Sequence, residues 1–277
     1  MPSPTEIAVS QLGRLVGLPD APVLLDVRSD EHFAADPRFI PCSRRRDHRT
    51  VETWAGSFKG QHVVVYCQHG HKTSQGVAAW LRQEGADAES LEGGFDAWMQ
   101  AGGLLVDSRK LPRRDAHERT VWVTRARPKV DRIACPWLIR RFVDPHAVFL
   151  FVAPNEVAGV AERFEATPFD VEGVFWTHRE GNCTFDTMLD ELGLDSPPLR
   201  QLANIVRGAD TARYDLAPEA PGLLAASVGF SRMFKDDLAQ LDAASVMYDA
   251  FYRRCRDAFD ETHNWPAAKP AAEAQRR

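Results

Sequence analysis

Short apolar runs alternate with amphipathic stretches in the first part of the chain. Residues 23–27 (VLLDV) and 63–66 (VVVY) have the nearly continuous apolar pattern of strands that are buried on both faces. Another short strand is expected to end at Leu91, and residues 73–84 have the pattern of a helix between the last two strands. Strands that alternate with helices predict an α/β unit with a parallel sheet covered by helices.

Beyond residue 118 the pattern predicts a second unit with its own core. Residues 120–124 and 147–152 are predicted strands, and residues 136–143 a short helix with Pro136 in its first turn. From Cys183 onward helices predominate. The last helix carries a predicted core-facing stripe at helical spacing, made of Leu238, Leu241, Ser245, Tyr248, Tyr252, Cys255 and Phe259. This unit is therefore expected to be a mainly helical α+β domain.

A charged, proline-containing stretch separates the two units. Residues 107–115 (DSRKLPRRD) show no apolar period, which is typical of a connecting segment. We therefore predict a first domain at 1–106, a linker at 107–117, a second domain at 118–262 and a disordered tail at 263–277.

Composition narrows the function classes. The chain has 277 residues, 44% of them hydrophobic, and a net charge of −5 that argues against specific nucleic-acid binding. The start MPSPTE has no basic region followed by an apolar stretch, and no run approaches the roughly 20 apolar residues of a spanning helix, so no membrane role is expected. Five cysteines without a Cys-x-x-Cys pair argue against a disulfide framework or a thiolate zinc site, and favour a cytoplasmic location.

Cys67 is the strongest candidate for chemistry, because it lies directly between a predicted strand and a predicted helix. Loop N–H groups at a helix N-terminus favour an anion, so they should stabilise the thiolate. Lys72 and two nearby histidines should add to this effect and lower the pKa of the thiol below the value of about 8.5 for free cysteine. The loop that follows is too polar for an inert core cysteine, since it consists of Gln68, His69, Gly70, His71, Lys72 and Thr73.

Three segments, in this order, resemble the signatures of rhodanese-type sulfurtransferases. The first consists of residues 24–28 (LLDVR) together with 31–33 and 40–41, the second of residues 67–73 (CQHGHKT), and the third of residues 91–98 (LEGGFDAW). The sequence departs from the family before Ile40, where Arg38-Phe39 replaces a usual Gly-His pair, and after Pro41, where the small residue is Cys42.

The resemblance implies a rhodanese-like fold and a sulfurtransferase activity. Cys67 would take a sulfane sulfur from a donor such as thiosulfate or a glutathione persulfide, hold it as a persulfide and pass it to a thiol or cyanide. Lys72 and the other loop residues would bind the anionic donor, and Asp26 and Arg28 of the first signature would support the site. No cofactor is required for this transfer.

Residues from about 118 to 259 resemble the C-terminal domain of bacterial chromate resistance proteins of the ChrB type. The carrying segments are residues 131–142 (DRIACPWLIRRF), 166–170 (ATPFD), 183–189 (CTFDTML) and 205–211 (IVRGADT). The resemblance implies a role in chromate resistance, as a regulator or accessory protein, with chromate as a further candidate partner.

The second unit also contains candidate ligand-binding residues. Six cations fall within residues 125–141 and could suit a tetrahedral oxyanion, although a solvated basic face is equally consistent: Arg125, Arg127, Lys129, Arg132, Arg140 and Arg141. Asp210 lies on the apolar face of a predicted helix, where a carboxylate needs a partner. That partner could be Arg207, one turn back.

Alternatively, His178 and Asp186 could join Asp210 around iron, manganese or zinc. A polar pocket edged by Arg132 and Arg207 would then hold either a metal or an oxyanion.

Three function classes are consistent with these residues. The first is a rhodanese-type sulfurtransferase in a protein associated with chromate resistance, and the second is a non-catalytic protein that responds to chromate or binds oxyanions. The third is a phosphatase or arsenate reductase on a rhodanese-like fold. A Cys-x5-Arg phosphate loop would need arginine six positions after Cys67, where Thr73 stands, so the third class is disfavoured.

Overall fold

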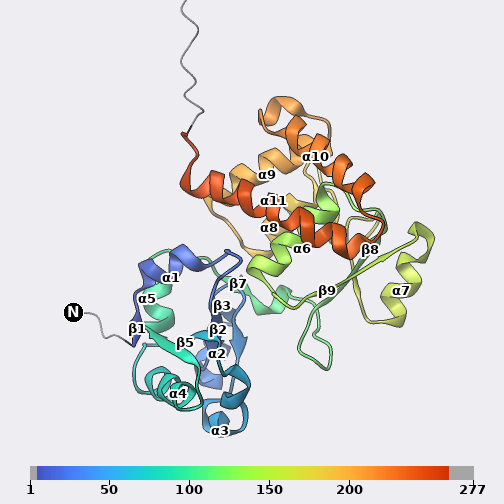
Figure 1. Ribbon diagram of the computed structural model, residues 1–277. Helices are drawn as coiled ribbons and strands as arrows, with labels where there is room; N and C mark the ends of the chain where they lie inside the picture. The colour runs from blue at the N-terminus through green and yellow to red at the C-terminus, as the bar shows by residue number, and fades with distance from the viewer. Residues whose placement is uncertain (1–4, 262–277) are drawn as a thin grey trace, which may run out of the picture.

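The computed structural model describes residues 5–261 and contains two domains that lie against each other (Figure 1). The tail predicted at 263–277 falls outside the described residues. The predicted fold class is confirmed, since an α/β domain with a parallel sheet precedes a helix-rich domain. Among residues 5–261, no helix combines the length and the apolar composition that crossing a membrane requires.

A five-stranded parallel sheet, in the order β1-β6-β5-β2-β4, forms the centre of the first domain. The segments 48–50 and 55–58 add 3₁₀ turns. The elements are β1 (Glu6–Ile7), α1 (Val9–Leu15), β2 (Val23–Asp26), α2 (Asp30–Ala35), β3 (Arg38–Phe39), β4 (Arg44–Arg45), α3 (Val51–Trp54), β5 (His62–Tyr66), α4 (Lys72–Gln83), β6 (Asp87–Leu91), α5 (Gly94–Gln100) and β7 (Val106–Asp107).

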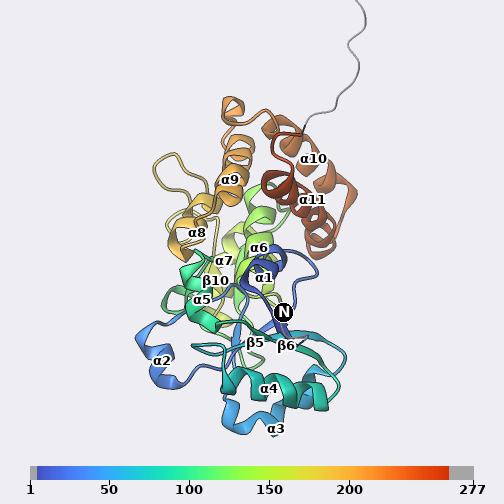
Figure 2. The same cartoon turned by 90° about the vertical axis from the view of Figure 1, so that its left-hand side faces the viewer.

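Side chains of β5 alternate between two apolar layers, as a strand buried on both faces requires. Val63 and Val65 pack with α3 and α4, whereas Val64 and Tyr66 pack with α1 and α5. Figure 2 shows α4 and α3 below the sheet and α1 on its other side. This arrangement fixes the carboxyl end of β5, where Cys67 follows.

The second domain is built on a three-stranded parallel sheet in the order β10-β8-β9. Val123 faces the helix α7, and Trp122 faces the larger core formed with the remaining helices. The elements are β8 (Val121–Arg125), α6 (Asp131–Phe142), β9 (Val148–Val152), α7 (Val157–Arg163), β10 (Thr167–Pro168), α8 (Thr184–Leu192), α9 (Pro197–Asp210), α10 (Ala220–Met233) and α11 (Asp237–Asp257), with 3₁₀ turns at 108–110, 154–156 and 214–216.

Two helix predictions in this domain need correction. The helix predicted at 136–143 begins at Asp131, so Pro136 lies inside α6 rather than in its first turn. Proline removes one backbone hydrogen bond there, but α6 is buried along most of its length, and this packing outweighs the loss. In α11 the predicted stripe is confirmed from Leu241 to Cys255, whereas Leu238 and Phe259 at its ends are about half exposed.

The segment predicted as a linker is ordered and joins the two domains closely. β7 pairs antiparallel with β3, and Phe39 and Val106 of these strands are buried in the core of the second domain. The backbone N–H of Cys42 also donates to the carbonyl of Phe142 at the end of α6, over 3.2 Å. The domains therefore share an apolar contact as well as the connecting chain.

Candidate active site

Cys67 follows β5 and lies at the N-terminal end of α4, as the sequence predicts. Its sulfur is 3.3 Å from the hydroxyl of Ser74, and the residue is 8% exposed. Burial raises the pKa of the thiol, but the Ser74 hydroxyl and the backbone N–H groups of Ser74, His71 and His69 stabilise the thiolate more, so the pKa is lowered. The site therefore favours a nucleophilic sulfur.

Close backbone packing shapes the Cys67 loop. Gly70 has φ +69°, and a Cβ there would lie 2.6 Å from the backbone nitrogens of Gly93 and Gly94. The backbone N–H of Phe95 donates to the carbonyl of Cys67 over 3.0 Å. Because these glycines carry no side chains, the backbone of the turn before α5 packs directly against the Cys67 loop. This packing explains why residues 91–98 occur together with the cysteine motif.

Asp96 is a site residue to which the sequence alone assigns no role. Its carboxylate accepts from the side-chain amide of Gln68 at 2.5 Å and lies 2.6 Å from Nδ1 of His69. His69 and His71 stabilise the thiolate through their backbone N–H groups, after the hydroxyl and backbone N–H of Ser74, and not through their rings as expected. In the sequence, the only indication that Asp96 belongs to the site is its position directly after Phe95 in the third rhodanese-like segment.

The remaining predicted loop residues lie at the start of α4. His71 is the residue before the helix, Lys72 is its first residue, and both are exposed. Thr73 is half-buried. An exposed lysine at this position can meet an anionic donor as it arrives from solvent.

Asp26 and Arg28 form a buried ion pair of 2.6 Å between Oδ2 and Nη2. The guanidinium also donates to the carbonyls of Asp36 and Arg38, and it stacks 3.8 Å from the ring centroid of Phe95. This pair holds the segment before β3 against α5. These contacts connect the end of β2 with the segment before β3 and with α5.

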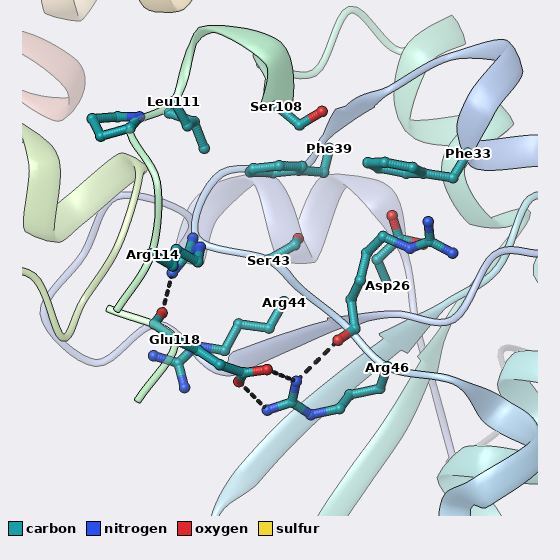
Figure 3. A pocket seen from close by; sticks show the side chains of 12 residues that line it. Asp26, Phe33, Phe39, Ser43, Arg44, Arg46, Ser108, Leu111, Arg114 and Glu118 are labelled. Atoms are coloured by element: carbon teal, nitrogen blue, oxygen red, sulfur yellow. Dashed lines mark hydrogen bonds and ion pairs between the residues drawn. The ribbon is translucent and has the colours of Figure 1, made fainter. Parts of the chain in front are cut away.

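A cavity of about 340 Å³ lies where the two domains meet (Figure 3). Residues of the first domain, such as Phe33, Phe39 and Arg46, line it together with Leu111 and Arg114 of the connecting segment and with Glu118. The loop 67–74 does not take part in its lining, so the cavity and the Cys67 site are separate.

The departures from the rhodanese pattern face this domain boundary. Phe39 enters the core of the second domain. Cys42, with φ +63°, lies 3.7 Å from the carbonyl of Arg140. Phe39 and Cys42 therefore contribute to the contact between the domains, whereas Arg38 pairs with Asp36 of the first domain.

In the second domain, His178 lies at the centre of three carboxylates. Its Nε2 is 3.5 Å from Asp131, 3.4 Å from Asp170 and 3.2 Å from Asp210. Hydrogen bonds to these carboxylates raise the pKa of His178 to about 12. Burial raises the pKa of Asp131 to about 7, with the charges of Asp210 and Asp170 adding to the effect.

Two expectations about this region change. Arg207 pairs with the buried Asp186 at 2.7 Å, rather than with Asp210, because α8 brings Asp186 to it. Asp186 is therefore outside the cluster around His178. Arg132 lies 3.3 Å from Asp170, so each of the two arginines at the predicted pocket already pairs with a carboxylate. Two further acids, Asp131 and Asp210, disfavour an oxyanion there.

Asp131 and Asp170 are the cluster residues that the sequence analysis missed. Both follow strands of one parallel sheet, and residues at the carboxyl ends of parallel strands commonly meet. β10 has only two residues, one of them Pro168, so the pattern of the chain gave little sign of it.

Comparison with known proteins finds one matching family model for each of the two domains. Residues 9–101 match the family model of the rhodanese-like domain, and residues 122–255 match that of the ChrB C-terminal domain. Protein ChrB of Cupriavidus metallidurans is 35% identical over 145 residues, which is 51% of this chain and 43% of that protein. The chain thus spans less than half the length of this curated relative.

Solved structures are similar to about a third of the chain. A rhodanese-related protein of Thermoplasma volcanium is 24% identical, with a TM-score of 0.32, over 36% of this chain and 96% of that one. A rhodanese-like domain protein of Staphylococcus aureus is 30% identical, with a TM-score of 0.30, over 34% of this chain and 90% of that one.

Proposed function

The chain joins a rhodanese-like domain to a ChrB C-terminal domain, and we propose that its first domain is a sulfurtransferase that works through a persulfide on Cys67. One observation carries the proposal. The sulfur of Cys67 lies where the Ser74 hydroxyl and backbone N–H groups of the loop converge, and the pKa of the thiol is lowered. Sulfur transfer requires a thiolate nucleophile, and a lowered pKa increases the fraction of the thiol in that form.

The reaction has two steps. The Cys67 thiolate attacks the outer sulfur of thiosulfate, a new S–S bond forms, the S–S bond of the donor breaks, and sulfite leaves with the electron pair. The terminal sulfur of the persulfide is then attacked by a thiolate or by cyanide, and Cys67 returns to the thiolate. The loop N–H groups and Ser74 would stabilise the negative sulfur at both stages, so that neither step needs a metal or an organic cofactor.

The donor and the biological setting follow from charge and from domain composition. The exposed Lys72 at the start of α4 suits an anionic donor such as thiosulfate or a glutathione persulfide. The resemblance of residues 122–255 to the ChrB C-terminal domain supports an association with chromate resistance. In this proposal chromate is the stress under which sulfur transfer is used, and the alternative is a first domain that only senses redox state.

Intact mass spectrometry tests the proposal directly. After incubation with thiosulfate, the wild-type protein should gain the mass of one sulfur atom, and the gain should disappear when cyanide is added and thiocyanate forms. Cys67→Ser should show neither change. Cys42→Ser is the matched control, because burial raises the pKa of the Cys42 thiol well above its ordinary range, and it should load sulfur like wild type.

Loading of sulfur on Cys67→Ser, or its absence from folded wild-type protein with both thiosulfate and glutathione persulfide, would leave the non-catalytic alternative in place. Circular dichroism should show that Cys67→Ser keeps the wild-type fold, since serine and cysteine are nearly the same size.

A further inference from the structure

A compact group of acidic side chains and one imidazole lies at the carboxyl ends of β8 and β10. These strands are parallel neighbours, and Asp131 and Asp170 follow them at the same edge of the sheet. His178 reaches the same point from the loop before α8. The carboxyl edge of a parallel sheet is a common place for ligand sites.

The spacing of these atoms fits a coordinated cation. One ligand atom from each of Asp131, Asp170 and His178 lies within 4.8 Å of the other two. Nε2 of His178 is 3.5 Å from Asp131 and 3.4 Å from Asp170. A metal with bonds of about 2.0 to 2.2 Å holds neighbouring ligand atoms about 3.0 to 3.5 Å apart. We propose that Asp131, Asp170 and His178 bind a divalent first-row transition-metal ion.

A buried oxygen without a partner gives independent support. Asp131 is 1% exposed, and its Oδ1 accepts no hydrogen bond within the described part of the chain. The other oxygen, Oδ2, accepts from the backbone N–H of Thr184 at 2.6 Å and is the one that lies 3.5 Å from Nε2 of His178. A buried carboxylate oxygen is costly to leave unsatisfied, and a cation that both oxygens of Asp131 bind would satisfy Oδ1.

Surrounding groups hold the acids in place, as metal ligands require. Thr184 is the common partner, since its backbone N–H binds Asp131 and its hydroxyl donates to Oδ1 of Asp170 at 2.9 Å. Val130, directly before Asp131, receives support from two other helices. Its N–H donates to the Ser227 hydroxyl, and its carbonyl accepts from the Tyr248 hydroxyl.

Two of the eight non-glycine residues with positive φ in the described part of the chain lie at the same place. Val130 has φ +35° and Asp170 has φ +51°. Positive φ is costly above all for a β-branched residue such as valine, and such strain persists mainly where function or surrounding structure requires it. The strained residues aim two carboxylates at one imidazole.

The donor set indicates the class of metal. Two carboxylates and one imidazole suit manganese, iron or zinc, whereas magnesium and calcium prefer oxygen ligands alone. Arg132 and Arg125 each lie 3.3 Å from Oδ2 of Asp170. The other oxygen, Oδ1, lies 3.4 Å from Nε2 of His178. Metal binding would displace the proton that His178 holds among these carboxylates. With the imidazole then neutral, the three acids, Asp210 included, and the two arginines leave one net negative charge, which favours a dication.

The site is open to solvent on the histidine side. The side chain of His178 is 43% exposed and that of Asp210 20%. Asp210 lies 3.2 Å from His178 but outside the group of mutually close ligand atoms. It would therefore be a neighbour of the metal site, and an ion could enter past it.

Titration with Mn²⁺ tests the site on the full-length protein after treatment with a chelator. Binding is followed by the loss of the electron paramagnetic resonance signal of free Mn²⁺. Wild type should bind one ion, and His178→Gln should weaken binding by at least about tenfold, because loss of even an outer-shell partner typically costs that much. His178 is half exposed, so this variant should fold.

Asp131→Asn provides the second variant, and Asp190→Asn on the exposed side of α8 is the control. Thermal unfolding with and without Mn²⁺ gives a second readout. The ion should raise the unfolding temperature of wild type and Asp190→Asn but not of the two ligand variants. Absence of stoichiometric binding, equal binding by folded His178→Gln, or displacement of Mn²⁺ by equimolar Mg²⁺ would overturn the proposal and leave an ion cluster centred on His178.

Discussion

The ring of Phe142 occupies the space that a side chain at Gly17 would need. A Cβ at residue 17 would lie 2.4 Å from Cζ of that ring, and Gly17 has φ +82°. Gly17 belongs to the first domain and Phe142 ends α6 of the second. The domain boundary therefore depends on the absence of a side chain at one position.

Replacing Gly17 by alanine should destabilise the protein by about 1 to 3 kcal/mol, because the new methyl group overpacks the boundary and the backbone is left-handed. Urea unfolding measures this change. Gly13→Ala is the control, since Gly13 lies in α1 with open space around it, and alanine should stabilise that helix by about 0.5 to 1 kcal/mol. Equal stability of the two variants would contradict the close contact.

The lowered pKa of Cys67 predicts how its reactivity depends on pH. Thiolate forms as pH rises through the pKa, so alkylation by iodoacetamide should reach half its maximal rate at a lower pH than for free cysteine, about 8.5. Ser74→Ala removes a hydroxyl that stabilises the thiolate, and the midpoint should move upward. Peptide mass spectrometry after timed quenching gives the rates.

Ser57→Ala, on an exposed turn whose hydroxyl donates to the Trp54 carbonyl, should leave the midpoint of Cys67 alkylation unchanged. The assignment of Ser74 would fail if its removal left the midpoint where it was in wild type.

Asp96 should matter to sulfur loading although it does not touch the sulfur. Asp96→Asn weakens the bonds that hold Gln68 and His69, and the loading rate with thiosulfate should fall about tenfold, which corresponds to about 1.4 kcal/mol. Asp87→Asn, exposed at the start of β6, is the control. Single-turnover mass spectrometry measures the rate, and an equal rate in both variants would remove Asp96 from the site.

The sequence predicts the first site better than the second because its information is local. An apolar run, a polar loop and a helical pattern lie within a few residues of Cys67, and they specify where its sulfur lies. The contribution of Asp96 could not be predicted in the same way, since it depends on how closely the Cys67 loop packs against the glycine turn before α5. Backbone contacts of that kind leave little trace in residue type.

The cluster in the second domain depends on long-range pairing. Asp131 was missed because Pro136 suggested a later helix start, and Asp170 because β10 is too short to recognise. The predicted metal ligands His178 and Asp210 do meet, whereas Asp186 turns to Arg207. Only the packing of α8 on α9 decides between these partners.

The shared core has a consequence for biosynthesis. Phe39 and Val106 are buried among side chains that come from the second domain, so during translation the first domain leaves the ribosome before its cover has been made. Its sheet can form, but the apolar side chains of Phe39 and Val106 stay exposed until α6 has been synthesised. In this interval the nascent chain is most prone to aggregation and to chaperone binding. A destabilising mutation in the second domain would therefore also affect the folding of the first domain.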